Sequence, residues 1–320
     1  MAMSWPTLKQ NNLKQMKILV ATEKPFAAAA VTGIREVVEQ GGHELVLVEK
    51  GTKQDMINAI ADCAGLIVRS DKVDKEVFDA APQLKVVVRA GAGYDNIDLD
   101  EATKHGVCVM NTPGQNANAV AELVFGMIVS LIRNRYNGTS GTELKGKTLG
   151  IHAYGAVGRN VARIAKGFDM KVSALDPFVK DEVMEADGII PVHSVEDLYK
   201  NNQFVSLHIP ANDQTRKSVN RALLELMPKG GTLINAARKE VINEEDLAAV
   251  LEERADLRYV ADVKPDNAAI LEEKFPERVF FTPKKMGAQT AEANINAGLA
   301  AANQVVAHLK DGFNRFQVNK

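Results

Sequence analysis

The chain has 320 residues, of which 39 are Lys or Arg and 41 are Asp or Glu, so its formal net charge is −2. This near balance gives no overall field that would favour nucleic acid or an anionic membrane as a partner. Apolar residues at 46% and charged residues at 25% are typical of a globular protein, and the length is sufficient for about two domains.

The opening segment, residues 1–15, is a polar extension that precedes Met16. It lacks the apolar core of a secretion signal, and no later run approaches the roughly 18 apolar residues that a membrane span requires. Two cysteines, Cys63 and Cys108, have neither metal-type spacing nor the number needed for a disulfide framework, so no metal is expected. We therefore expect a cytoplasmic protein with no membrane partner.

Short aliphatic runs alternate with helical ones, such as Ala27–Glu39 and Lys75–Ala80, from Met16 onward. The first strand-like series is KILVAT, ELVLV, GLIVR, KVVVRA and VCVMN, and the second is KTLGIHA, KVSALD, FVSLHI, GTLINA, RYVADV and VFFTP. Apolar strands that alternate with helices predict parallel sheets covered on both faces. The sequence thus predicts an α/β fold with two doubly wound parallel sheets.

Two long helical runs connect the series. Asn118–Arg133 lies between them, and Ala291–Leu309 follows the second series and leads to a final strand-like run, RFQVN. We expect residues 16–114 and 288–320 to form a flavodoxin-like, substrate-binding domain. Residues 115–287 would form a Rossmann-type, NAD-binding domain inserted into it.

Arginines follow two strands of the first series. Arg69 and Ser70 end one strand, and Arg89 ends the next, just before a glycine-rich stretch. Backbone N–H groups in such a stretch can hold a carboxylate, and nearby guanidinium groups suit a second anion such as phosphate. The alternative is that these arginines only cap the sheet. The candidate substrate-binding residues are Arg69, Ser70, Arg89, Gly91, Ala92 and Gly93.

A strand, a tight turn and a helix occupy KTLGIHAYGAVGRNVARIAKGF. In the dinucleotide-binding fingerprint G-x-G-x-x-G, glycines allow the backbone to approach a pyrophosphate at the helix N-terminus. Gly155 and Gly158 fill the second and third positions, whereas Ala153 fills the first, which is acceptable if its φ stays negative. The turn residues expected to bind the cofactor are Tyr154, Gly155, Ala156, Val157 and Gly158.

A carboxylate ends the next strand, where Asp176 lies 18 residues after Gly158 and just before Pro177. Such a carboxylate accepts hydrogen bonds from ribose hydroxyls and repels a 2′-phosphate. Asp176 could instead be only a turn residue. With the preceding turn it predicts a domain that selects NAD over NADP.

These segments, together with LHIPANDQTRKSVN, LINAARKEVINEEDL and FTPKKMGAQTAEA, occur in the order seen in the D-2-hydroxyacid dehydrogenases, which the chain resembles from Met16 onward. Within that family it most resembles members that oxidise 3-phospho-D-glycerate to 3-phosphohydroxypyruvate in serine biosynthesis, in a short form without regulatory domains. The resemblance implies a phosphorylated 2-hydroxy acid as substrate. It also implies a homodimer built through Asn118–Arg133.

Family members use an arginine, a glutamate and a histidine. The resemblance places the arginine at Arg238, where it would hold the substrate carboxylate and carbonyl. The glutamate position is Asn267, and the histidine position is Lys285. Two of the three chemical residues therefore differ from the family pattern.

The two differences are consistent with each other. A carboxylate partner would raise the pKa of a lysine, and Asn267 replaces that partner with a neutral amide. We expect Lys285 to be the general acid/base, with Arg238, Lys284 and burial under the nicotinamide favouring its neutral form. The alternatives are that Lys284 or Asp266 carries the proton.

The resemblance also gives the remaining cofactor contacts. His208 is read as structural or cofactor-lining rather than catalytic, and His152 as a packed side chain. The further residues expected at the cofactor are Pro177, His208, Ile209, Pro210, Ala236, Ala237, Arg238, Asp262, Lys285, Gly287 and Ala288.

Two other activities remain open. One is a reductase of hydroxypyruvate, glyoxylate or another D-2-hydroxyacid, which would have less need for Arg69 and Arg89. The other is a non-catalytic protein that senses NAD(H), which the altered histidine and glutamate positions would suit.

Overall fold

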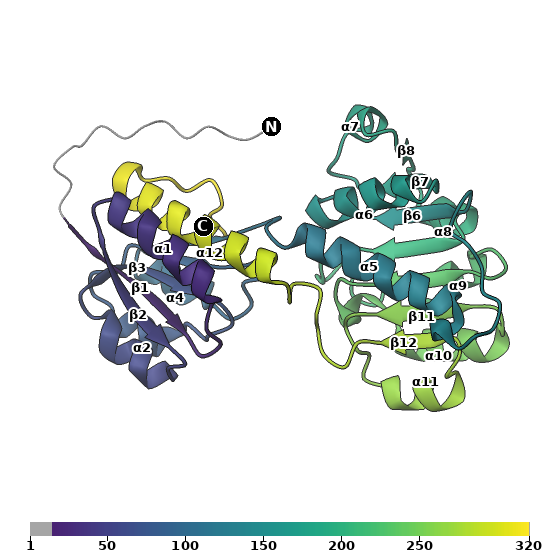
Figure 1. Ribbon diagram of the computed structural model, residues 1–320, viewed down its shortest axis with the longest axis horizontal. Helices are drawn as coiled ribbons and strands as arrows, with labels where there is room; N and C mark the ends of the chain where they lie inside the picture. The colour runs from purple at the N-terminus through teal and green to yellow at the C-terminus, as the bar shows by residue number, and fades with distance from the viewer. Residues whose placement is uncertain (1–14, 320) are drawn as a thin grey trace. The chain divides into compact units, whose positions relative to one another are not determined.

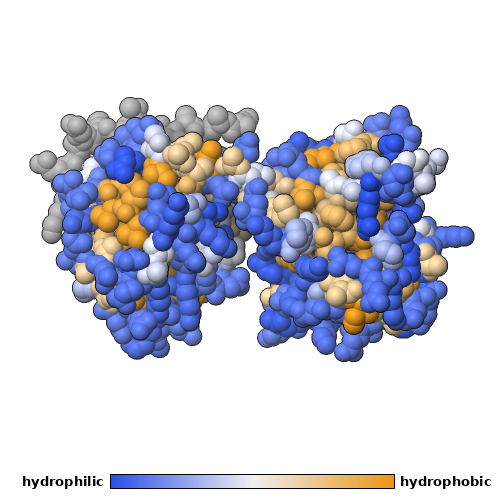
Figure 2. All heavy atoms as spheres, turned by 60° about the horizontal axis from the view of Figure 1, so that its bottom comes forward, coloured by the Kyte–Doolittle hydropathy of each residue, from blue (hydrophilic) through white to orange (hydrophobic). Residues whose placement is uncertain are grey.

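The computed structural model describes residues 15–319, so most of the predicted N-terminal extension lies outside the described residues. The chain divides into two compact units. Unit 1 contains the chain up to Gln115 and from Asn294 onward, and unit 2 contains Asn116–Ala293. Figure 2 shows hydrophilic side chains over much of the visible face of each unit, with smaller apolar groups between them.

Unit 1 is built on a five-stranded parallel sheet with the order β2-β1-β3-β4-β5 (Figure 1). This is the strand order of flavodoxin-like folds, so the predicted fold of this unit is confirmed. The strands are β1 Lys17–Thr22, β2 Glu44–Glu49, β3 Cys63–Val68, β4 Val86–Arg89 and β5 Cys108–Asn111. The helices are α1 Ala28–Gln40, α2 Lys53–Ile60, α3 Lys75–Asp79 and α4 Leu99–Lys104, with most of α12 Ala291–Asp311.

Two apolar cores lie on opposite faces of this sheet. The core on one face joins the sheet to α1 and α12, and the other joins it to α2, α3 and α4. Every side chain of β3 is buried, as its uninterrupted apolar sequence predicted. The prediction that RFQVN forms a closing strand is wrong. Residues 315–319 form no strand, and their one pairing is an isolated bridge from Gln317 to Met110.

Unit 2 contains a seven-stranded parallel sheet with the order β12-β11-β10-β9-β6-β7-β8. The strands are β6 Thr148–His152, β7 Lys171–Leu175, β8 Ile190–Pro191, β9 Phe204–Leu207, β10 Thr232–Asn235, β11 Arg258–Ala261 and β12 Val279–Phe281. Helices α5 Ala117–Ile132, α6 Ala156–Gly167 and α7 Asp181–Ala186 cover one face. The other face carries α8 Val195–Asn201, α9 Arg221–Leu226, α10 Glu244–Glu253 and α11 Ala268–Lys274. The short 3₁₀ turns η1 Asn134–Tyr136 and η2 Lys239–Val241 complete the unit.

The connections of this sheet run in opposite directions from β6, toward β7 on one side and β9 on the other. In open α/β sheets, ligands bind beyond the carboxyl ends of strands at such a reversal. The expected dinucleotide position is therefore the end of β6, where the glycine-rich turn begins.

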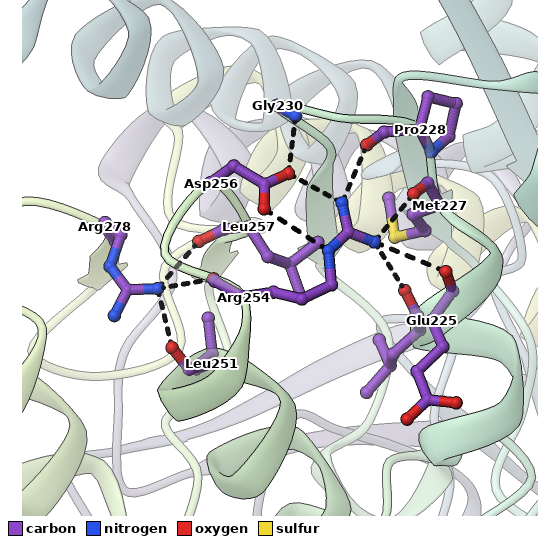
Figure 3. Close-up of polar contacts among 10 residues, drawn as sticks. Glu225, Met227, Pro228, Gly230, Leu251, Arg254, Asp256, Leu257 and Arg278 are labelled. Atoms are coloured by element: carbon purple, nitrogen blue, oxygen red, sulfur yellow. Dashed lines mark hydrogen bonds and ion pairs between the residues drawn. The ribbon is translucent and has the colours of Figure 1, made fainter.

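Arginine side chains hold the opposite, amino-terminal ends of β10, β11 and β12 together (Figure 3). The guanidinium of Arg254 donates to the carbonyl of Met227 at 2.7 Å and to the carboxylate of Asp256 at 2.6 Å. Asp256 also accepts from the backbone N–H of Gly230 at 2.8 Å, and Arg278 donates to the carbonyl of Arg254 at 2.9 Å. These bonds connect the loops that precede β10, β11 and β12. They leave the carboxyl-terminal ends of the strands, where ligands bind in such sheets, without a part in this cluster.

No helix among residues 15–319 is long and apolar enough to cross a membrane.

Candidate functional site

The glycine-rich turn connects β6 to α6, and its glycines have different roles. A Cβ atom on Gly158 would lie 2.3 Å from the carbonyl oxygen of Ala153, so no side chain fits there. A Cβ on Gly155 would meet nothing within 4 Å, because this residue faces open space at the start of α6. The turn therefore has the open approach and the helix N-terminus that a pyrophosphate requires.

Ala153, at the first glycine position, has an unusual backbone conformation. Its φ is +82°, in the left-handed region that glycine adopts readily and alanine does not. The condition under which alanine would be acceptable here, a negative φ, is therefore not met. The turn keeps the backbone path of a glycine and places a Cβ atom on it, at a cost of about 1 kcal/mol.

Asp176 lies just after β7, and both of its carboxylate oxygens are oriented by backbone N–H groups. Oδ2 accepts from Tyr154 in the glycine-rich turn at 2.8 Å, and Oδ1 accepts from Phe178 at 2.9 Å. Each oxygen has a second lone pair that a ribose hydroxyl can use. The carboxylate therefore fits the ribose of NAD, and its fixed charge opposes a 2′-phosphate.

Two histidines lie beside this turn, at the ends of β6 and β9. Burial lowers the pKa of His152 to about 4, and burial together with His152 lowers the pKa of His208 to about 3. The ring of His208 is hydrogen-bonded to Ser206 Oγ at 2.9 Å, and His152 packs edge-on against Tyr199. Both rings are neutral near pH 7, which suits residues that line a cofactor site more than a proton carrier.

Asp262 organises the turn that carries the two lysines. Its carboxylate is buried and accepts from the backbone N–H groups of Met286 at 2.6 Å and Gly287 at 2.8 Å. The hydroxyl of Thr282 donates to the same carboxylate at 2.9 Å. Lys284 and Lys285 lie on this turn with exposed side chains. The backbone of the turn is therefore fixed by the Asp262 carboxylate.

Arg238 follows β10 in a turn that Asn235 closes. Asn235 is buried; its amide donates to the carbonyl of Arg238 at 2.9 Å and its oxygen accepts from Ala237 at 3.0 Å. The guanidinium of Arg238 donates to the carbonyl of Ala237 at 3.0 Å. We did not single out Asn235 from the sequence, although an asparagine that bonds the backbone two residues on is a known turn signal.

Asn267 and Asp266 are held by another part of unit 2. The Asn267 amide donates to the carbonyl of Glu244 at 3.2 Å, and the Asp266 backbone N–H donates to the Glu244 carboxylate at 2.9 Å. The carboxylate of Asp266 forms an ion pair with Lys239. Glu244 was also missed from the sequence, because its contact with Asn267 joins residues far apart in the chain.

In unit 1, the guanidinium of Arg89 lies against Gly91. A Cβ on Gly91, whose φ is +149°, would lie 1.3 Å from Arg89 Nη1, so only glycine leaves room for this arginine. The Nε of Arg89 donates to the carbonyl of Arg69 at 3.0 Å, and the Asn111 amide donates to the carbonyl of Ala92 at 2.6 Å. The stretch from Gly91 to Gly93 is thus fixed at its centre.

The guanidinium of Arg69, by contrast, is hydrogen-bonded to other residues of unit 1. Its Nη1 donates to the carbonyls of Lys24 at 3.0 Å and Pro25 at 2.9 Å, and its Nη2 to the side chain of Asn294 at 2.5 Å. The guanidinium also lies over the Phe26 ring. Arg69 therefore anchors the loop after β1, whereas Ser70 beside it is exposed.

Comparisons with known proteins identify the family of the chain. The family described as "D-isomer specific 2-hydroxyacid dehydrogenase, NAD binding domain" matches residues 121–284. The chain is 35% identical to the D-3-phosphoglycerate dehydrogenase of Methanocaldococcus jannaschii, over 91% of this chain and 57% of that protein. It is 33% identical to the hydroxypyruvate reductase of Thermotoga maritima, over 80% of this chain and 88% of that protein.

A solved structure extends the similarity to the whole length of its chain. The NAD⁺-bound 3-phosphoglycerate dehydrogenase of Entamoeba histolytica is 46% identical, with a TM-score of 0.85, and the match covers 96% of this chain and 99% of that one. By contrast, this chain spans only about half the length of other phosphoglycerate dehydrogenases that it matches. It covers 57% of the Methanocaldococcus jannaschii protein and 54% of the Sus scrofa protein.

Proposed function

This chain belongs to the D-isomer specific 2-hydroxyacid dehydrogenases, and from that membership we propose that it oxidises 3-phospho-D-glycerate to 3-phosphohydroxypyruvate with NAD. The observation that carries this proposal is the 46% identity, over nearly the full length of both chains, to a 3-phosphoglycerate dehydrogenase that binds NAD⁺. The reaction would supply a precursor for serine biosynthesis.

The cofactor preference rests on Asp176. Its two oxygens are oriented by Tyr154 and Phe178, so the carboxylate cannot easily turn away from an incoming 2′-phosphate. Bringing a phosphate dianion against a fixed carboxylate is unfavourable. We therefore expect NAD(H) to bind more tightly than NADP(H).

The phosphate preference rests on Arg89 and the backbone next to it. Gly91 leaves the guanidinium room to lie flat against the chain, and residues 91–93 are a candidate nest for an anion. Arginine pairs with phosphate through two parallel hydrogen bonds. Arg69 anchors the loop at Lys24 and Pro25. We therefore assign it a role in positioning this loop, and assign direct contact with the phosphate to Arg89.

Arg238 and Lys285 would perform the remaining steps on the substrate. The Arg238 guanidinium would hold the carboxylate and fix the orientation of the 2-hydroxyl group. Lys285, as a neutral amine, would take the hydroxyl proton as the C2–H bond breaks, leaving a ketone and an ammonium group. When bound, NAD supplies the acceptor for the hydride. In the reverse direction the ammonium returns the proton.

A lysine that acts as the general acid/base requires neighbouring charges different from those that suit a histidine. A nearby carboxylate would stabilise the ammonium form and raise the pKa of the amine. The position that resembles the family glutamate is neutral Asn267, and the carboxylate of Asp266 is already paired with Lys239. These contacts favour Lys285 over Asp266 as the proton carrier.

The similarity to the Thermotoga maritima hydroxypyruvate reductase supports one alternative, reduction of an unphosphorylated keto acid. Steady-state oxidation of NADH with 3-phosphohydroxypyruvate and with hydroxypyruvate separates the two. We expect kcat/KM to be about a hundredfold higher for the phosphorylated substrate, because unpaired anion-binding groups penalise the smaller one. Equal or better turnover of hydroxypyruvate would instead support the reductase. Binding of NADH without turnover of either would indicate a sensing protein.

A further inference from the structure

A pocket on one side of unit 2 lies between α6 and the end of α7, two helices that Figure 1 shows near the β7–β8 edge of the sheet. Its volume is about 530 Å³, enough for a small metabolite. Its polar lining is Tyr154, Arg159, Asn160, Arg163, Lys166 and Asp187.

The cations in this lining outnumber the acids by three to one. The three cations lie on one face of α6, at positions separated by four and three residues. The only carboxylate in the lining is that of Asp187, which accepts from Arg159 at 3.5 Å. The pocket therefore has an excess of two positive charges.

The two other cations are bound to neutral groups. Arg163 donates to the amide oxygen of Asn118 at 2.7 Å, and Lys166 donates to the backbone carbonyl of Asp187 at 2.8 Å. Asn118 in turn donates to Glu122, a carboxylate that does not line the pocket. Within residues 15–319, neither Arg163 nor Lys166 forms an ion pair. Both side chains are exposed and can turn toward a ligand.

Hydrogen bonds hold Tyr154 and Asp187, which also line the pocket. The Tyr154 side chain is only 1% exposed, and its hydroxyl donates to Asp187 at 2.9 Å. Burial and this acid raise the pKa of Tyr154, so the hydroxyl keeps its proton and the bond persists. The backbone of the same residue is held by Asp176, and Arg159 lies over its ring. A ligand would meet a preformed wall at Tyr154 and Asp187, and binding would need to order only the exposed cations of α6.

We propose that this pocket is a second anion site, which takes a small multiply charged anion such as a phosphate ester or a polycarboxylate. The anion binds to Arg163 and Lys166, and Arg159 turns from Asp187 to join them. The site is separate from the predicted pyrophosphate position, because it uses the side chain of Tyr154 and not the open face of Gly155. It is independent of which hydroxy acid the protein oxidises.

The direct test is a crystal of the full chain with NADH, soaked in tungstate, a phosphate-sized anion with a strong anomalous signal. We expect a tungsten peak within hydrogen-bond distance of the Arg163 guanidinium and the Lys166 amine. A second copy of the chain that fills the pocket, or tungsten peaks only at other positions, would overturn the proposal.

A solution measurement distinguishes a real site from an adventitious ion only. Binding of inorganic phosphate to NADH-saturated protein is followed by calorimetry for wild type and for R163Q/K166Q. The matched control is K171Q/K200Q, which removes two exposed lysines outside the pocket. Loss of two charge-assisted contacts should weaken phosphate binding about tenfold or more in R163Q/K166Q alone. Equal binding in the two double variants would overturn the proposal, even if tungsten is found in the pocket.

Discussion

The buried carboxylate of Asp262 accepts a hydrogen bond from the backbone N–H of Gly287 at 2.8 Å, and this contact joins the end of β11 to the two-lysine turn. The same acid accepts from Met286 and Thr282. One side chain therefore determines the backbone path on both sides of the position from which Lys285 would act.

We predict that Asp262→Ala lowers both activity and stability. It leaves two backbone donors of the turn without their acceptor, which costs about 2–3 kcal/mol in the free energy of unfolding. With the turn no longer fixed, kcat should fall about a hundredfold. Urea unfolding and steady-state kinetics measure the two effects. Glu277→Ala, which removes an exposed carboxylate elsewhere in unit 2, is the control, and equal losses in both variants would contradict the prediction.

Ala153→Gly should stabilise the protein. A glycine at φ +82° removes the steric cost of the Cβ atom, and part of that gain is offset by the greater freedom of glycine in the unfolded chain. We expect a net gain of up to about 0.5 kcal/mol in the free energy of unfolding. Ala156→Gly, in the first turn of α6, is the matched control and should destabilise the protein. A loss of stability in Ala153→Gly would refute this reading of the turn.

Much of the architecture could be predicted because it depends on local apolar patterns. The strands that the alternation predicted and the long helices are present, with ends that differ by one or two residues. The edge strand β8 Ile190–Pro191 was missed, because two residues are too short a run to show an apolar pattern. The closing strand failed for a physical reason. RFQVN has a strand-like composition, but only Gln317 pairs with a neighbouring strand, and pairing depends on contacts across the chain.

Less of the candidate site could be predicted from the sequence. The glycine-rich turn and Asp176 follow a fixed spacing, so their positions could be inferred. The left-handed backbone of Ala153 could not, since an alanine gives no signal for positive φ. Contacts such as Asn267 with Glu244, and Arg69 with Lys24, join residues that no spacing rule connects.

Acid should weaken the arginine cluster shown in Figure 3. Its hydrogen bond with Arg254 lowers the pKa of Asp256 to about 2. A depressed carboxyl pKa adds stability above the unfolded value near 3.8, and this stability is lost as pH falls through about 2. Asp256→Asn should therefore lose about 2 kcal/mol near neutral pH and little at the acid end, as measured by urea unfolding across that range. A loss that does not change with pH would contradict the prediction.

Gly91→Ala tests the phosphate site of unit 1. The new Cβ would overlap Arg89 Nη1, so the guanidinium must move. We expect KM for 3-phosphohydroxypyruvate to rise about tenfold to a hundredfold, with a much smaller change for hydroxypyruvate. Gly106→Ala is the control, because Gly106 also has positive φ but its Cβ would meet nothing within 4 Å. The same substrate-selective effect in Gly106→Ala would mean that backbone strain, and not Arg89, is responsible.

Lys285→Ala tests the proton carrier. For oxidation of 3-phospho-D-glycerate the amine must be neutral, so wild-type activity should rise as pH increases through the pKa of the lysine. For the reverse reaction the ammonium is required, so activity should fall over the same range. Lys285→Ala should lose about a hundredfold to ten-thousandfold in kcat and also lose this pH-dependent limb.

Two further variants make the Lys285 prediction specific. Lys285→His should recover part of the activity and move the limb toward the ordinary histidine pKa of about 6.5. Lys284→Ala, at the neighbouring exposed lysine, should keep the limb even if its midpoint shifts, because a nearby cation influences the pKa without carrying the proton. If Lys284→Ala loses the limb and Lys285→Ala keeps it, the roles of the two lysines are exchanged. If both keep it, a different group transfers the proton, and Asp266→Asn becomes the variant to measure.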